Sequence, residues 1–166
     1  ADLFVASSFA DLVPLANLLE TLESALRPGG LAYLPLTFDG GTIFQPDHEA
    51  DDAVEAVYHE AIANEPGRDP YAGRHVAAKL SERAGTILGL ASSDWLVRSG
   101  ADDTYPADEA YFLARILDFV AETVGDANAS VPGFDDWLRT RREQLAASDL
   151  IYVAHQYDLL YQMPDA

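Results

Sequence analysis

Two apolar stretches, DLFVASS at residues 2–8 and LAYLPLTF at residues 31–38, decide the fold. Each is short and apolar, as expected of a buried strand in a parallel sheet. The segment between them predicts a helix, because its leucines form one stripe at positions 15, 18, 19, 22 and 26. Pro28-Gly29-Gly30 then ends the helix and turns the chain. The pattern therefore predicts a strand, a helix and a second strand parallel to the first.

The rest of the chain continues this alternation of helices and strands. Helices are expected at residues 51–64, 74–84, 106–125 and 134–147, and strands at 86–98 and 150–163. Gly40-Gly41 and Pro46 predict a loop over residues 39–50. Pro35 lacks an N–H donor, so the strand at 31–38 is expected to pair irregularly there. This order predicts an α/β fold in which helices flank a mostly parallel sheet.

Composition excludes several classes of protein. Of the 166 residues, 49% are hydrophobic, enough for one domain with a core over residues 1–166. Asp and Glu number 28 against 10 Lys and Arg, and the resulting charge of −18 would repel nucleic acids and anionic membranes. The acid excess can also simply solvate the surface. The chain lacks cysteine, a secretory leader and a stretch approaching roughly 20 apolar residues, so we expect a cytoplasmic protein without disulfides.

Residues 2–12 resemble the fourth strand, and the turn after it, of class I S-adenosylmethionine-dependent methyltransferases. Leu26-Arg27-Pro28-Gly29-Gly30 resembles the turn before the fifth strand of that family. The resemblance implies the carboxy-terminal half of a Rossmann-like methyltransferase sheet, mostly parallel, with the last strand antiparallel between the fifth and sixth. It also implies that residues 40–85 form a helical and loop insertion over the acceptor side. Thr37 to Gly40 and Tyr152 to Asp158 look like a bacterial subgroup that methylates small molecules.

The motifs that hold the methyl donor in this family are missing from the chain. They are a Gly-rich turn after the first strand and an acidic residue that ends the second strand. Gly40-Gly41, Gly85 and Gly89 have neither the spacing nor the order of that turn. The implied cofactor is S-adenosyl-L-methionine, and we expect this chain alone to bind it poorly or not at all. The donor-binding half is expected upstream of residue 1.

Candidate site residues follow from the rule that ligands of open parallel sheets bind at the carboxyl ends of the strands. By resemblance, Ser7, Ser8 and Phe9 line the donor pocket, although strand-end hydroxyls often bond only to the backbone. The second strand ends in Thr37, Phe38 and Asp39. Thr37 and Phe38 are substrate-binding candidates. Asp39 is the candidate base that takes a proton from the acceptor, or an ordinary turn aspartate.

Two further substrate-binding candidates lie elsewhere in the sequence. His59 belongs to the helix expected to cover the acceptor, and Tyr152 begins the last strand. A lone histidine is more often solvated than functional, and His155 is expected to be a structural histidine. The spacing of Asp47, His48 and His59 does not support a metal site.

The aromatic side chains and the charge lead to three hypotheses for function. Aromatic residues either line an apolar acceptor pocket or belong to the core; they are Trp95, Tyr105, Tyr111 and Phe112. The leading hypothesis is methyl transfer to a small-molecule acceptor, uncharged or cationic, by a protein of which this chain is a part. The alternative is a non-catalytic methyltransferase-like module for interaction or dimerisation, whose exposed sheet edge and apolar sheet face would favour self-association or docking on the absent half. A third is an unrelated acidic α/β binding protein.

Overall fold

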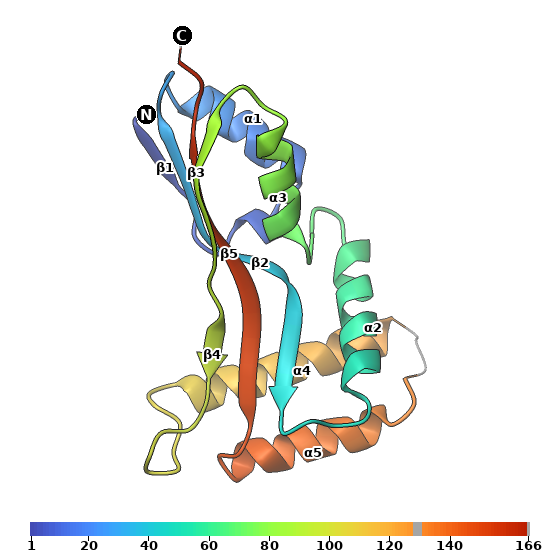
Figure 1. Cartoon of the computed structure of the whole chain (residues 1–166). Coiled ribbons are helices and arrows are strands. Elements are labelled where there is room, and N and C mark those ends of the chain that lie inside the picture. Colours follow the sequence, from blue (N-terminus) through green and yellow to red (C-terminus); the bar gives the residue numbers. More distant parts are fainter. Residues whose placement is uncertain (128–130, 166) are drawn as a thin grey trace. The chain divides into compact units, whose positions relative to one another are not determined.

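A computed structural model describes residues 1–127 and 131–165 of the chain (Figure 1). The strands are β1 (Leu3–Val5), β2 (Leu31–Gln45), β3 (Thr86–Ser92), β4 (Trp95–Val97) and β5 (Ile151–Gln162). The α-helices are α1 (Leu15–Ala25), α2 (Asp51–Asn64), α3 (Ala72–Ser81), α4 (Glu109–Asp126) and α5 (Phe134–Ala146). A short 3-10 helix covers Ala10–Leu12. Each helix expected from the sequence is present, and α2 has the bounds expected for it.

The sheet is mixed, with the strand order β1-β2-β5-β3 and β4 paired with β5. β1 and β2 are parallel, with Leu3 opposite Leu31 and Val5 opposite Tyr33. β5 is antiparallel to both β3 and β4. The last strand therefore lies between β2 and β3 and runs against its partners. This confirms the expected α/β fold, with helices flanking a mostly parallel sheet and an antiparallel last strand.

The chain divides into two compact units, to which β2 and β5 both contribute residues. Unit 1 consists of Ala1–Gly40, Ala63–Asp94 and His155–Ala166, and unit 2 of Gly41–Ile62 and Trp95–Ala154. Residues 40–85, which we expected to form one insertion, are divided between the two units after Ile62.

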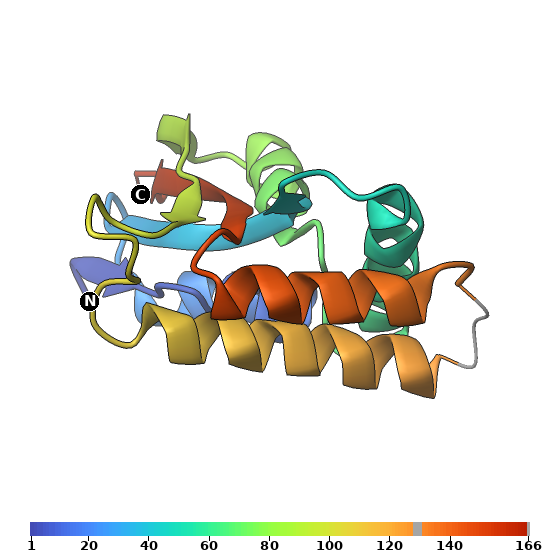
Figure 2. The same ribbon diagram turned by 90° about the horizontal axis from the view of Figure 1, so that it is seen from below.

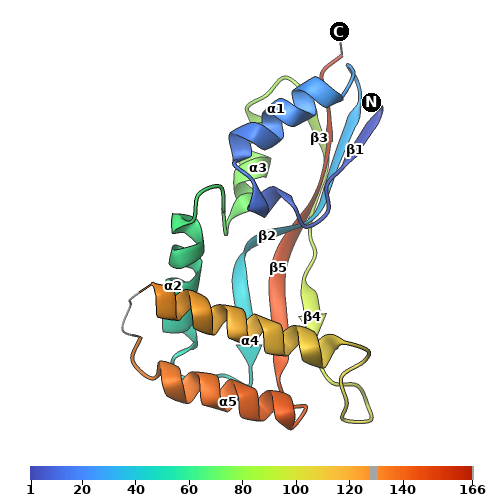
Figure 3. The same cartoon turned by 180° about the vertical axis from the view of Figure 1, so that it is seen from behind.

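The core of unit 1 lies between α1, α3 and one face of its strands (Figure 3). The leucine stripe of α1 is buried as expected, and Leu34 of β2 and Leu80 of α3 are buried beside it. The expectation that the first strand is buried is wrong for two of its side chains, because Leu3 and Val5 are each 54% exposed. β1 is the outermost strand of the sheet, and α1 and α3 cover only the opposite face.

The loop expected over residues 39–50 is confined to residues 46–50, because β2 continues to Gln45. Gly40 and Gly41 both have positive φ, which allows the strand to bend without ending. The irregularity expected at Pro35 lies one residue later. Leu36 has a φ of +55°, which departs from extended strand geometry. The Leu36 N–H donates to Asp158 Oδ1 at 2.8 Å.

The strand expected at residues 86–98 is interrupted between β3 and β4. The interruption falls at Ser93 and Asp94. Ser93 donates its N–H to the carbonyl of Gln156 at 2.8 Å and its hydroxyl to Asp158 Oδ1 at 3.0 Å. These bonds hold the chain beside β5 without continuing the strand.

The helices α4 and α5 of unit 2 lie side by side (Figure 2). Arg141 and Trp137 of α5 are fully buried, and both donate to Asp51 Oδ1. Burial raises the pKa of Asp51, but hydrogen bonds from Arg141, Trp137 and the His48 backbone outweigh it and hold the pKa below its usual value. Among the described residues, no helix is both long enough and apolar enough to cross a membrane.

Candidate functional site

The turn after β1 presents Ser7, Ser8 and Phe9 at the surface of unit 1. All three are exposed, Phe9 by 43%. Ser8 has a φ of +51°, and its N–H donates to the carbonyl of Pro35 at 3.1 Å. The turn is therefore tied to β2, and its side chains face solvent at the carboxyl end of the parallel pair.

Asp39 is almost completely buried in unit 1, with 1% of its surface exposed. Its Oδ1 accepts the backbone N–H of Arg74 at 2.6 Å, in the first turn of α3. Arg74 Nε lies 3.0 Å from Oδ2, and Arg74 Nη2 donates to the carbonyl of Asp39. Both carboxylate oxygens thus hold N–H groups of one residue. This geometry favours a positioning role for Asp39 over proton abstraction.

Close packing at two glycines brings α3 against β2. A Cβ on Gly40 would lie 2.4 Å from the ring of Tyr71, and a Cβ on Gly73 would lie 2.9 Å from the Cβ of Asp39. The Arg74 guanidinium lies 4.8 Å from the centre of the Tyr71 ring, within range of a cation–π interaction. Tyr71 and Arg74 therefore form one surface beside Asp39 and Gly40 of β2 in unit 1.

A carboxylate–histidine pair, Asp69 and His75, lies beside Tyr71. Asp69 Oδ2 lies 2.7 Å from Nδ1 of His75, and Asp69 Oδ1 accepts the Tyr71 N–H at 2.9 Å. Asp69 in turn donates its backbone N–H to the carbonyl of Asp11 at 3.1 Å. Burial raises the pKa of Asp11, and the nearby charge of Asp69 adds to the effect. Asp69 is therefore bonded to the start of α3, through Tyr71 and His75, and to the turn after β1, through Asp11.

His75 has the geometry of a general base. A carboxylate that accepts from Nδ1 fixes the tautomer of the ring and leaves Nε2 with a free electron pair. The side chain of His75 is 51% exposed, so an acceptor molecule can reach it. The group can take a proton from a hydroxyl or an N–H, which is the step that such acceptors need before they attack an electrophile.

Sequence analysis missed His75. It lies six residues after Asp69, across Pro70, a spacing that would place the two side chains on different faces of a continuous helix. Here the turn before α3 brings them together. The proximity of an aspartate, a proline turn and a histidine at the start of a helix was the only signal available in the sequence.

The candidates His59 and Tyr152 belong to unit 2 and not to this group. His59 is 4% exposed, with Nε2 3.0 Å from the hydroxyl of Thr42, and burial lowers its pKa despite the charge of Glu55. Tyr152 is 6% exposed and packs against the ring of Phe44, and burial raises its pKa. The six candidates from residues 7–9 and 37–39 share unit 1, whereas these two are core residues of unit 2.

The remaining aromatic candidates also lie in unit 2. Trp95 stacks on Phe112 at 4.3 Å, and the hydroxyl of Tyr105 donates to the carbonyl of Leu150 at 2.8 Å. Tyr111 is 70% exposed. These contacts place Phe112 and Tyr105 against the core, so the four rings do not form a common pocket. In the part of the chain that is described, no group of three or more acidic or histidine side chains could hold a metal ion.

Comparison with known proteins finds similarity to solved structures and none to a family model or a curated protein. No protein-family model matches the sequence, and no curated protein is detectably similar to it. Among solved structures, a Bacillus halodurans C-125 protein described as a putative methyltransferase has a TM-score of 0.49 and 10% sequence identity. The match covers 98% of this chain and 64% of the other protein, so the chain spans less than two thirds of that structure.

Proposed function

We propose that this chain is the acceptor-side part of a class I S-adenosylmethionine-dependent methyltransferase that acts on a small molecule. The observation that carries the proposal is the position of β5, which lies antiparallel between β2 and β3. An ordinary α/β alternation would add its last strand parallel at one edge. The resemblance of residues 2–12 and 26–30 to this family implies the same position for the last strand, and that resemblance rests on the sequence alone.

The residues of the chain fit the donor only in part. Ser7, Ser8 and Phe9 offer two hydroxyls and an aromatic ring at the carboxyl end of β1, where a donor would lie in an open parallel sheet. The chain supplies neither a Gly-rich turn nor an acidic strand end for the ribose. Binding of S-adenosylmethionine therefore requires a further segment, and the chain alone provides one edge of the site.

The acceptor would be deprotonated by His75. Asp69 holds the ring through Nδ1, which leaves Nε2 to accept a proton from a hydroxyl or an N–H. Near His75 the acidic Asp11 and Asp69 are offset by the half-exposed Arg74, so the preference for an uncharged or cationic acceptor rests on the net charge of −18 of the whole chain. Asp39 would act through Arg74, because its oxygens are both engaged there.

Calorimetry and the upstream reading frame test this proposal together. Titration of S-adenosylmethionine into the chain should give no heat of binding. A longer form that includes an upstream strand and Gly-rich turn should bind one donor per chain. If the chain of residues 1–166 binds the donor alone, our account of where the donor site lies is wrong. If the upstream frame encodes no such strand and turn, the enzyme proposal fails.

Exposed side chains of β1 and β2 favour the second candidate, a non-catalytic module that associates with itself. Leu3, Val5 and Tyr33 lie on the face of the sheet away from α1 and are 54%, 54% and 39% exposed. β1 also ends the strand order and so leaves one edge free to pair. Analytical ultracentrifugation distinguishes the two candidates. Self-association that Val5→Lys abolishes, in a chain with no upstream donor segment, would favour the module.

A further inference from the structure

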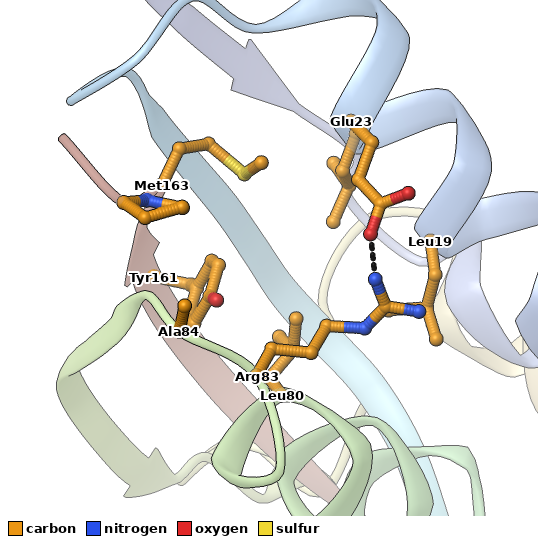
Figure 4. A pocket seen from close by; sticks show the side chains of 9 residues that line it. Leu19, Glu23, Leu80, Arg83, Ala84, Tyr161 and Met163 are labelled. Carbon is orange, nitrogen blue, oxygen red and sulfur yellow. Dashed lines mark ion pairs between the residues drawn. The ribbon is translucent and has the colours of Figure 1, made fainter. Parts of the chain in front are cut away.

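A cavity of about 410 Å³ lies between α1, α3 and the end of β5 in unit 1 (Figure 4). Its walls are mostly aliphatic, and the main side chains are Leu19, Leu22, Leu80 and Met163. Met163 donates its N–H to the carbonyl of Gly30, just before β2, so the cavity lies at the amino ends of the parallel strands. The Asp69–His75 pair lies at the other end of these strands. The cavity is thus separate from the proposed acceptor site.

Two polar features face this apolar space. Arg83, in the turn after α3, and Glu23 of α1 form an ion pair, with side chains 38% and 49% exposed (Figure 4). The hydroxyl of Tyr161, a residue that is 2% exposed, accepts the N–H of Gly85 at 3.0 Å. That bond uses the oxygen as acceptor and leaves the hydroxyl hydrogen available to donate. A side chain at residue 85 would collide with this hydroxyl, since a Cβ there would lie 2.2 Å from it.

The lining selects the charge and size of a ligand. The ion pair is neutral overall, so it does not favour a charged ligand: a carboxylate would be repelled by Glu23 and an ammonium group by Arg83. The volume lies within the usual range for small-molecule pockets. An apolar cavity of about 150 Å³ holds benzene, so this one has room for an aliphatic chain of roughly eight carbons. The Tyr161 hydroxyl, which lines the cavity, can donate a hydrogen bond to such a ligand.

We infer that this cavity binds a neutral aliphatic molecule with one hydrogen-bond acceptor, such as an alcohol, ketone or ester. The alkyl chain lies against Leu19, Leu22 and Leu80, and the acceptor oxygen takes the hydroxyl hydrogen of Tyr161. The inference does not depend on methyl transfer, because none of these residues belongs to the proposed acceptor site.

Titration of the chain with 1-octanol, octanoate and octylammonium tests the inference. Calorimetry should give one 1-octanol site per chain, with octanoate and octylammonium at least about tenfold weaker because each opposes one charge of the ion pair. Methyl NMR shifts should be confined to Leu19, Leu22, Leu80 and Met163. From 1-hexanol to 1-octanol, affinity should rise roughly fourfold per added carbon.

Two variants locate the site. Ala84 lines the cavity and is exposed, so Ala84→Phe should fill the space without disturbing the core and weaken 1-octanol at least about tenfold. Ala56→Phe, at an exposed position of α2, is the matched control and should leave the affinity unchanged. The inference is overturned if Ala84→Phe binds 1-octanol as well as the unaltered chain does. It is equally overturned if octanoate or octylammonium matches 1-octanol, or if 1-octanol does not bind.

Discussion

The two units place their charged pairs differently. In unit 2, Arg141 is fully buried and donates to Asp51, so the pair is enclosed among aromatic side chains. In unit 1, the carboxylate of Asp39 is buried but its partner Arg74 is half exposed, and so is His75 beside Asp69. The pair in unit 2 therefore stabilises a core, whereas the two pairs in unit 1 leave the Arg74 guanidinium and the His75 ring half exposed to solvent.

Removal of the enclosed guanidinium should have the largest effect on stability. Arg141→Met removes a fully buried guanidinium and leaves Asp51, whose side chain is 27% exposed, without its charged partner; each charge-assisted hydrogen bond that is lost costs about 1.5–3 kcal/mol. Arg142→Met is the matched control, because its side chain is 55% exposed and its ion pair with Asp118 contributes at most about 1 kcal/mol. Urea unfolding followed by tryptophan fluorescence measures both. Equal losses in the two variants would contradict the distinction between enclosed and exposed pairs.

The second largest loss of stability is expected from a substitution at Gly40, where β2 bends in unit 1. Gly40→Ala should lower the free energy of unfolding by about 1–3 kcal/mol, because the backbone has positive φ and a Cβ would strike the ring of Tyr71. Gly125→Ala, with open space around residue 125 in α4, should instead gain up to about 1 kcal/mol. Thermal unfolding of both variants checks this. A neutral Gly40→Ala would mean that Tyr71 does not need the close approach.

Within unit 1, substitution of the buried Asp39 should destabilise the chain more than substitution of the half-exposed His75. Asp39→Asn replaces a buried acceptor of several N–H groups and should cost about 1–3 kcal/mol. His75→Gln changes a half-exposed side chain and should cost no more than about 0.5 kcal/mol. Urea unfolding gives both values. If His75→Gln is the more damaging of the two, His75 is a structural residue and not an available base.

The smallest effect should come from the buried histidine of unit 2. Burial lowers the pKa of His59 in the folded chain below its unfolded value near 6.5, so its stabilising contribution is complete above pH 6.5. It is lost as pH falls through the folded pKa, because folding then opposes protonation. The unaltered chain should therefore lose more stability between pH 7 and 5 than His59→Gln does. Unfolding curves at several pH values compare them, and identical pH dependence would refute the assignment.

Much of the fold could be predicted because local patterns specify it. The leucine stripe of α1 and the bounds of α2 follow from helical periodicity, and Pro35 correctly marks the irregular point of β2. Gly40-Gly41 predicted a loop because glycine pairs usually end strands. The continuation of β2 depends on the ring of Tyr71, which lies about thirty residues later and packs where a Cβ would be. A long-range contact of this kind leaves no local signal.

The candidate site was predictable only where strand ends define it. Ser7 follows from the rule for the carboxyl ends of parallel strands. Asp39 was chosen by the same rule, but β2 continues past it to Gln45, so Asp39 lies within the strand; both residues are in unit 1. His75 was missed because its position depends on the turn that brings Asp69 to Nδ1. His59 and Tyr152 were chosen by sequence position, but the packing of unit 2 buries them. Burial is a property of the whole fold that their neighbours in sequence do not reveal.

The most direct test of the methyltransferase account is an NMR titration with S-adenosylmethionine. The ¹⁵N-labelled chain of residues 1–166 should show no shifts, and a longer form carrying the upstream donor segment should shift the amides of Ser7, Ser8 and Phe9. Shifts in the chain alone, or shifts in the longer form that avoid these three residues, would contradict the account.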